Sequence, residues 1–198
     1  MLEFKNVTVS LPGGEASTSF SMMLSGGETA CLCGPAGSGK SRLLRAVMGL
    51  TPVASGYITV DGELVGPDSA GYLRQKISFV PSQMPDVQMK VSDLCRSVYD
   101  LRINHDAGLT KEKLMEEWHL LGIDESVYGL PVSEVEQQIQ QLVLLSLLPL
   151  LKRPIVLVDN LLQTEQTYRL LQRLVADGAE VLYTCKDNRT PCDKLIKF

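Results

Sequence analysis

Segments with the apolar pattern of strands alternate along the chain with segments that have the apolar spacing of helices. The pattern predicts strands at residues 2–11, 28–33, 55–65, 76–82, 155–159, 180–184 and 194–198. It predicts helices at residues 42–50 and 164–177. The alternation slips near Asn6, and the Asp61-Gly62 pair predicts the turn of a hairpin. Strands that alternate with helices in this way are typical of an α/β fold.

Between residues 86 and 148 the pattern becomes helical. Leu114, Trp118 and Leu121, for example, recur at the spacing that places them on one helix face. We therefore expect a helical subdomain at about residues 86–148, inserted between two strands of the sheet. The apolar run at residues 142–151 is shorter than the roughly 20 residues that a bilayer span needs, so we expect a buried helix and no membrane span.

The composition is that of an ordinary globular protein. The 198 residues are 44% hydrophobic with a formal net charge of −4, so we expect one domain with a buried core and no nucleic-acid partner. The five cysteines follow no disulfide or zinc spacing, and neither His105 nor His119 has metal-ligand spacing. The first residues show neither the basic start nor the apolar core of an export signal, so the expected location is the cytoplasm.

The segment GPAGSGKS at residues 34–41 carries the first chemical signal. It fits the pattern G-x-x-x-x-G-K-[ST] and lies between a predicted strand and a predicted helix. Glycine lets the backbone wrap closely around a phosphate chain, the helix N-terminus adds positive potential, and Lys40 adds a charge for the β- and γ-phosphates. The predicted nucleotide-binding residues are Gly34, Pro35, Ala36, Gly37, Ser38, Gly39, Lys40, Ser41 and Arg42.

A magnesium ion beside these phosphates needs hard oxygen ligands. The hydroxyl of Ser41 is one candidate. Asp159 is the other, because it ends the apolar strand IVLVD, and α/β sheets place their ligands at the carboxyl ends of strands.

The order of these parts resembles the ATP-binding cassette of ABC transporters over essentially the whole chain. Residues 27–65, from the strand through the loop to the hairpin, resemble the opening half of that family closely. The resemblance implies a P-loop NTPase core of ABC type with an antiparallel β subdomain and the inserted helical subdomain, as one nucleotide-binding domain over residues 1–198. It also implies ATP and Mg²⁺ as cofactors, a second ABC-type subunit that completes each ATP site, and a membrane protein as partner.

Several catalytic positions differ from the family pattern. A glutamate that polarises the attacking water would follow Asp159, but this chain has Asn160, and an amide accepts no proton at neutral pH. Loss of a general base costs about 10² to 10⁴ in rate. Cys185 stands in place of the switch histidine, which contacts the γ-phosphate. Ser82 stands in place of the glutamine that senses Mg²⁺, as a metal contact of shorter reach, with Gln83 one position away.

Two further positions bear on the nucleotide. The family signature Leu-Ser-Gly-Gly-Gln would fall within VSEVEQQIQQ, residues 132–141. Ser133 and Glu136 there have the spacing of a capping box, so we expect the chain's own side chains to satisfy the helix start that should clasp a phosphate. The aromatic residue that stacks on adenine would fall near Leu11, which offers apolar cover without stacking.

The leading hypothesis is therefore a degenerate ABC-type subunit that binds Mg-ATP with weak or no hydrolysis and has a regulatory or structural role. It would lie in the cytoplasm, held at the inner face of a membrane where a partner recruits it. One alternative is an active ABC ATPase completed by partners or by other residues, for example Asp187 or Glu165. Another is a small P-loop nucleotide kinase, although residues 96–153 hold few of the arginines that phosphoryl transfer uses.

Overall fold

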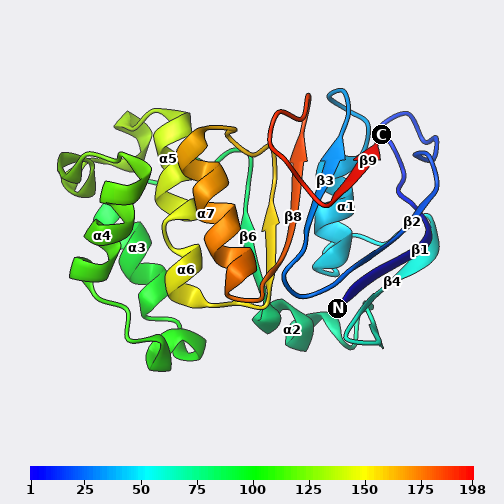
Figure 1. Cartoon of the computed structure of the whole chain (residues 1–198), viewed down its shortest axis with the longest axis horizontal. Helices are drawn as coiled ribbons and strands as arrows, with labels where there is room; N and C mark the ends of the chain where they lie inside the picture. The colour runs from blue at the N-terminus through cyan, green and yellow to red at the C-terminus, as the bar shows by residue number, and fades with distance from the viewer.

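The fold is an α/β arrangement, taken from a computed structural model (Figure 1). The structure describes residues 1–104 and 108–198 in full, and the side chain of His105 lies outside them. The strands are β1 Leu2–Thr8, β2 Phe20–Leu24, β3 Thr29–Cys33, β4 Ser55–Val60, β5 Glu63–Leu64, β6 Ile77–Val80, β7 Ile155–Val158, β8 Glu180–Cys185 and β9 Lys194–Lys197. The α-helices are α1 Lys40–Val47, α2 Ala70–Leu73, α3 Val91–Tyr99, α4 Lys111–Leu121, α5 Gln137–Leu145, α6 Leu148–Leu151 and α7 Glu165–Ala176.

The strands form two sheets. One is antiparallel, in the order β2-β1-β4-β5, and the other has the order β6-β7-β8-β3-β9 with parallel pairing throughout. Figure 1 shows α3 to α7 gathered at one end of the molecule and the antiparallel strands at the other. The parallel sheet stands between them, with β8 flanked by β7 and β3. Because parallel strands end at one edge, the segments after β3, β7 and β8 are neighbours.

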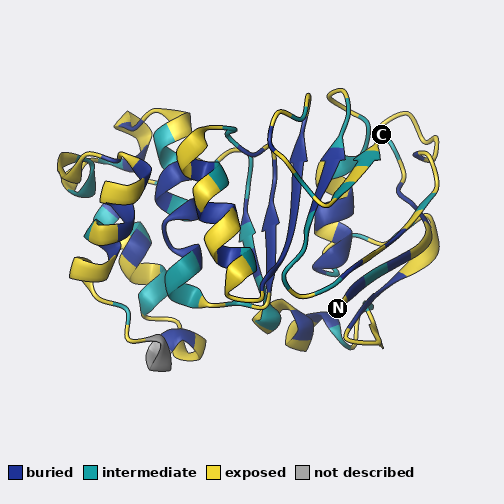
Figure 2. Cartoon of the chain, in the orientation of Figure 1, coloured by how far each residue is buried: buried dark blue, intermediate teal, exposed yellow. Residues whose placement is uncertain are grey.

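A hydrophobic core lies on each face of the parallel sheet. Alternate strand residues supply the two cores: Leu157 and Leu182 face α1 and the antiparallel sheet, whereas Val158 and Tyr183 face the helical end. Figure 2 shows the central strands as almost entirely buried. Strands covered on both faces carry nearly continuous apolar sequence, and β7 accordingly reads Ile-Val-Leu-Val with every residue buried.

Most of the predicted strands and helices are confirmed, and two local details are as well. Asn6 has a φ of 49° where the pairing of β1 shifts register. Asp61 and Gly62 have φ of 53° and 81° between β4 and β5, the backbone of a hairpin turn. The single helix predicted at residues 142–151 is wrong: α5 ends at Leu145, and α6 starts at Leu148 with proline in its first turn.

The helical end is tied together by one aromatic side chain and one ion pair. Trp118 of α4 is fully buried, and its indole N–H donates to the hydroxyl of Ser146 at 3.0 Å. Arg173 of α7 donates to the two carboxylate oxygens of Glu117 from Nη1 and Nη2, at 2.9 and 2.6 Å. Two parallel hydrogen bonds of this kind fix orientation as well as distance, so α4 and α7 are held in register. In the part of the chain that the structure describes, no helix is long and apolar enough to cross a bilayer.

Candidate functional site

The loop between β3 and α1 has glycine at points where no other residue fits. An ideal Cβ on Gly34 would lie 2.5 Å from the carbonyl oxygen of Phe198. Gly39 has a φ of 99°, in the left-handed region, and a Cβ there would lie 2.8 Å from Val9 Cγ2. Both positions require glycine, and between them the loop curves tightly into the N-terminus of α1, where backbone amides and the helix dipole favour an anion.

Lys40 is the first residue of α1, and its ammonium group folds back over the loop. Nζ donates to the carbonyl oxygens of Gly34 and Pro35, both at 2.7 Å, and to the hydroxyl of Ser38 at 3.2 Å. Burial lowers the pKa of this ammonium group, while the charge of Asp159 acts in the opposite direction. The loop thus holds a partly desolvated cation, for which a phosphate group would be a stronger partner than neutral carbonyls.

Asp159 directly follows β7, and its buried carboxylate joins three elements. Oδ1 accepts hydrogen bonds from the hydroxyls of Ser41 on α1, at 2.9 Å, and Thr184 on β8, at 2.8 Å. The amide of Asn160 donates to the same Thr184 hydroxyl oxygen at 2.7 Å. Among the described residues no donor contacts Oδ2 of Asp159, so this oxygen is the free one.

These groups border a cavity of about 670 Å³, which we call the loop cavity. Every residue of the predicted binding loop except Pro35 lines it, and Asp159, Asn160 and Ser82 line it as well. Its lining includes one acidic residue and four basic residues, which are Lys40, Arg42, Arg45 and Lys186. The predominance of basic residues favours an anionic ligand.

The oxygen donors of Ser41 and Asp159 are suited to magnesium. Mg²⁺ takes one or two protein oxygens and completes its shell with water and the phosphates of its ligand. The described residues include no group of three or more His, Cys, Asp and Glu side chains that could hold a metal by themselves. The donor set therefore fits an ion that arrives with a nucleotide rather than one held by the protein alone.

Ser82 follows β6 and is held by a residue that the sequence did not single out. Gln137, the first residue of α5, donates from Nε2 to the carbonyl oxygen of Ser82 at 2.9 Å. Gln83 also borders the loop cavity. A second polar cavity of about 480 Å³, the adjoining cavity, shares Ser82, Gln137, Asn160 and Lys186 with the loop cavity.

Gln141 connects α5 to the loop after Asp159. Its Nε2 donates to the carbonyl oxygens of Asp159, at 3.1 Å, and Asn160, at 3.3 Å. Its Oε1 accepts from the amide of Leu162 at 2.8 Å. One buried amide side chain thus fixes the backbone on both sides of Asn160, whose φ is 51°. Asparagine is among the few residues that adopt this left-handed conformation readily.

Cys185, the residue expected in place of the switch histidine, does not line the loop cavity. Its side chain is 1% exposed and belongs to the helical-side core, with Sγ 3.2 Å from Sγ of Cys31. Burial raises the pKa of this thiol to about 11, so it is neutral at physiological pH. The residue that follows, Lys186, lines the loop cavity instead. The strand edge that predicted Asp159 would also have predicted Thr184 and Lys186, because Thr184 is the penultimate residue of β8 and Lys186 directly follows the strand.

Thiol labelling tests this placement of Cys185. Cys33 and Cys192 are partly exposed, whereas Cys31, Cys95 and Cys185 are buried. We expect a small aromatic disulfide reagent to modify two thiols rapidly in the native protein and the other three only on unfolding, because a buried thiol is neither accessible nor ionised. Cys33→Ser should remove one rapid thiol, and Cys185→Ser should remove none. A rapid thiol that disappears in Cys185→Ser would contradict the buried placement.

The predicted capping box at Ser133 is wrong. Residues Val132–Glu134 form a separate 3₁₀ turn, α5 begins at Gln137, and its N-cap Glu136 makes no side-chain capping bond. Val132 and Val135 are buried, so packing of these two side chains, rather than capping, sets the conformation before the helix. The start of α5 is therefore not closed by the side chain of Ser133.

Leu11 itself does not line the loop cavity. Its Cδ2 would be 3.0 Å from a Cβ on Gly39, so it packs behind the loop. Ser10 and Pro12, on either side of it, line the loop cavity, and the guanidinium of Arg42 donates to the carbonyl oxygen of Ser10 at 2.9 Å.

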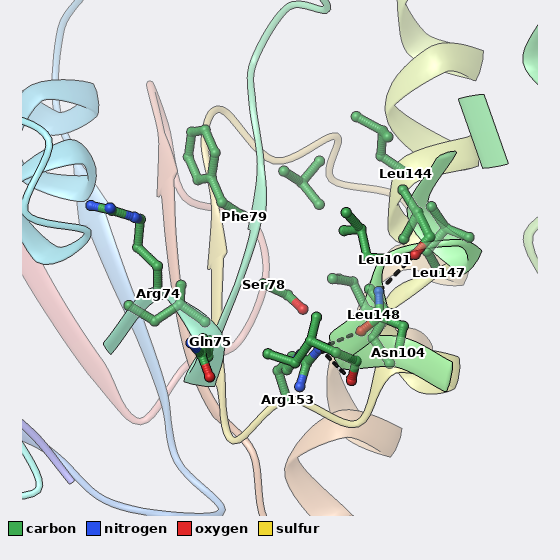
Figure 3. A pocket seen from close by; sticks show the side chains of 15 residues that line it. Arg74, Gln75, Ser78, Phe79, Leu101, Asn104, Leu144, Leu147, Leu148 and Arg153 are labelled. Atoms are coloured by element: carbon green, nitrogen blue, oxygen red, sulfur yellow. Dashed lines mark hydrogen bonds between the residues drawn. The ribbon is translucent and has the colours of Figure 1, made fainter. Parts of the chain in front are cut away.

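A separate cavity of about 330 Å³ lies between β6 and the helical end (Figure 3). Phe79 and Arg74 border one side, and leucines of α5 and α6 border the other. Arg153, which also lines this cavity, donates to Oδ1 of Asn104 and to the carbonyl oxygen of Ile103 (Figure 3). This cavity shares no lining residue with the loop cavity and consists mainly of apolar side chains, so the phosphate chemistry belongs to the loop cavity.

A family model described as ABC transporter matches residues 18–163, which is most of the chain. The chain belongs to the ABC transporter family. Members of this family bind ATP, typically with Mg²⁺. The binding loop, Ser82, Asp159 and Asn160 all lie within the matched segment of this cassette, whereas Lys186 lies beyond it.

Curated relatives match a limited stretch of this cassette. It is 36% identical over 81 residues to the phosphonates import ATP-binding protein of Hyphomonas neptunium, covering 40% of this chain and 31% of that protein. It is 39% identical over 82 residues to the glutamate/aspartate import ATP-binding protein of Escherichia coli K12, covering 40% of this chain and 34% of that protein. The aligned stretch thus spans about a third of the length of these relatives.

Solved structures share the fold over nearly the whole chain. An ATP-binding protein of Pyrococcus furiosus described as an ABC transporter gives a TM-score of 0.77 at 18% identity, covering 99% of this chain and 96% of that one. A dimeric ATP-binding cassette solved with ADP and phosphate gives 0.74 at 22% identity, covering 94% of this chain and 88% of that one. These likenesses establish that the fold of this cassette is that of ABC ATP-binding subunits.

Proposed function

We propose that this cassette binds Mg-ATP in the loop cavity and hydrolyses it slowly or not at all. One observation carries the proposal: the phosphate loop, Ser41 and Asp159 line a single cavity, and the residue that follows Asp159 in the chain is Asn160 instead of a carboxylate. The loop, Ser41 and Asp159 supply the groups that hold a nucleotide. Asn160 lacks the carboxylate that hydrolysis requires.

Binding rests on the loop, Lys40 and the two oxygen donors. Phosphate oxygens would take the place of the carbonyls that Lys40 now contacts, and the amides at the start of α1 would donate to them. Ser41 and Oδ2 of Asp159 would hold the metal, which would neutralise negative charge on the phosphates. This chain's own contribution is therefore positioning and charge.

Slow hydrolysis follows from the residues around Asn160. The side-chain amide of Asn160 has no basic site for a proton from water. Gln141 and Thr184 hold the backbone on both sides of this residue. Cys185 is buried away from the cavity as a neutral thiol. A water molecule beside the terminal phosphate would then have no base, which costs about 10² to 10⁴ in rate.

The alternative is an active ATPase completed by another group. Glu165 pairs with Arg169 on α7 with both side chains 71% exposed, and it lines neither polar cavity. Asp187 lines the adjoining cavity, as Asn160 does, so it is the carboxylate of this chain that supports the alternative. The family match favours either cassette function over the small kinase.

The proposed role is that of a regulatory or structural subunit. Cassettes of this family dimerise and work with membrane subunits. We propose that the nucleotide-binding domain extends over residues 1–198, with a helical subdomain at about residues 86–148. It would act in the cytoplasm with a second cassette and a membrane protein. The bound nucleotide would then stabilise the assembly more than its hydrolysis would supply energy to it.

Equilibrium binding and turnover on one preparation test this proposal. Wild type should bind ATP in the presence of Mg²⁺, and Lys40→Ala should bind it about tenfold less tightly, because a charge-assisted hydrogen bond to phosphate contributes about 1.5 kcal/mol or more. Lys90→Ala, an exposed lysine that lines neither polar cavity, should bind as wild type does.

Three outcomes decide between the possibilities. Equal weak binding by wild type and Lys40→Ala would overturn nucleotide binding itself. Phosphate release at one per second or faster, the usual range of working enzymes, would favour the active alternative if Lys40→Ala abolished it. Asp187→Asn would then show whether that carboxylate supplies the base.

A further inference from the structure

We propose that the guanidinium group of Arg42 stacks on the base of the bound nucleotide. The inference rests on the proposed function and deepens it, because the phosphate loop and the metal donors leave the base without a partner. None of the described residues that line the loop cavity is aromatic, and Leu11 packs behind the loop at Gly39. A flat side chain of another kind therefore has to cover the base, and arginine is the planar cation that stacks on aromatic faces.

The loop cavity has two ends. One end adjoins the second polar cavity, and Asn160 lines both cavities. The other, which we call the outer end, surrounds Arg42. Ser10 accepts a hydrogen bond from the side chain of Arg42, and Thr51 donates one to its carbonyl oxygen. These three residues line the loop cavity and not the adjoining cavity.

The order of the strands indicates which end would receive the base. Ser41 and Asp159 mark the place of the last phosphates, because a metal ion that accompanies a nucleotide bridges their oxygens, and Asp159 follows β7. The antiparallel strands lie on the opposite side of β3 from β7, and β1 leads toward Ser10 there (Figure 1). Since the base is at the other end of a nucleotide from its terminal phosphate, it would reach the outer end.

Hydrogen bonds set the position of the guanidinium group. Nη1 of Arg42 donates to the carbonyl oxygen of Ser10 at 2.9 Å, and the hydroxyl of Thr51 donates to the carbonyl oxygen of Arg42 at 3.2 Å. The amide of Leu11 donates to the carbonyl oxygen of Glu15 at 2.7 Å, which closes the turn after Ser10. The N–H donors of a guanidinium group lie in its plane, so the bond to Ser10 leaves the faces of this exposed side chain open for a base.

Arg45 is the other arginine that lines the loop cavity, and its position is less suitable. It lies three residues after Arg42 on α1, about 4.5 Å further along the helix from the phosphate loop. In the described part of the chain its guanidinium group meets no hydrogen-bond acceptor, so its plane is not fixed. A group that is already held in place loses less conformational freedom on binding, which favours Arg42.

Paired titrations with Mg-ATP and Mg-tripolyphosphate test this inference on the full chain. Tripolyphosphate has three linked phosphates without the ribose and the base. Arg42→Ala should bind ATP about five- to tenfold less tightly than wild type and tripolyphosphate within about twofold, because the lost stack involves only the base. Arg96→Ala, at an exposed arginine of α3 that lines neither polar cavity, should leave both affinities unchanged.

Arg42→Lys separates stacking from charge. Lysine keeps the positive charge but is a hydrated point charge without a plane. The variant should therefore bind ATP nearly as weakly as Arg42→Ala does. A contact between Arg42 and a phosphate, in contrast, would be largely restored by lysine and would weaken tripolyphosphate as much as ATP when it is lost.

The outcomes separate this inference from the proposed function. The inference is wrong, although the cassette still binds nucleotide, if Arg42→Ala weakens ATP and tripolyphosphate equally or weakens neither. It is also wrong if Arg42→Lys binds ATP as wild type does. If wild type binds neither ligand, the proposed function is wrong as well. The thermal midpoints of the variants should match that of wild type, because each substitution shortens an exposed side chain.

Discussion

Asp159→Asn is expected to lower the affinity for ATP about 100-fold in the presence of Mg²⁺ and to leave it almost unchanged in the absence of Mg²⁺. Asparagine keeps an oxygen that accepts from Ser41 and Thr184, so the local fold remains. It replaces the free carboxylate oxygen by an NH₂ group that repels a cation. Even substitution of a residue that only contacts a metal ligand lowers the affinity of a site for its metal about 10- to 100-fold. Titration calorimetry with ATP in Mg²⁺ and then in EDTA measures the difference.

The comparison needs a carboxylate that is near the site but is not a proposed metal ligand. Asp187→Asn serves, because Asp187 lines the adjoining cavity and not the loop cavity. It should retain the full effect of Mg²⁺ on binding. The magnesium site is misplaced if Asp159→Asn responds to the metal as strongly as wild type does.

Trp118→Ala is expected to lower the free energy of unfolding by about 4 kcal/mol. The indole is fully buried at the centre of the helical end, and its removal leaves a cavity as well as losing the bond to Ser146. Ser146 still donates to the carbonyl oxygen of Val143, so the hydroxyl keeps one partner. Urea unfolding followed by circular dichroism should show the midpoint lowered by about 1.5 M.

Two variants show whether the effect comes from the buried ring. Trp118→Phe keeps most of the volume and should cost about 1 to 2 kcal/mol. Leu120→Ala lies on the same helix with its side chain 55% exposed, and it should change stability by less than about 0.5 kcal/mol. An alanine variant at Trp118 that loses less than about 1 kcal/mol would mean that the helical end packs around other residues.

The sequence was sufficient to predict features that depend on neighbouring residues in the chain. The slip of β1 at Asn6, the hairpin turn at Asp61 and the loop before Lys40 each depend on residues that are adjacent in the chain. Asp159 was also predictable, because a strand with apolar residues throughout must be buried on both faces and must end at the ligand edge.

Contacts between segments that lie far apart in the chain could not be predicted from the sequence. Ser133 has the spacing of a helix cap, but burial of Val132 and Val135 delays the helix until Gln137. The resemblance led us to expect Cys185 at a functional position, whereas side-chain alternation in β8 directs it into the core. The bonds from Gln137 to Ser82 and from Thr184 to Asp159 depend on how the sheet is ordered, which no local pattern encodes.

The side chain of Gln141 couples α5 mechanically to the segment that carries the carboxylate of Asp159. It lies in the second turn of α5, and its amide bonds to Asp159, Asn160 and Leu162 span the segment that carries the free oxygen. A displacement of α5 would therefore be transmitted to that oxygen through one side chain.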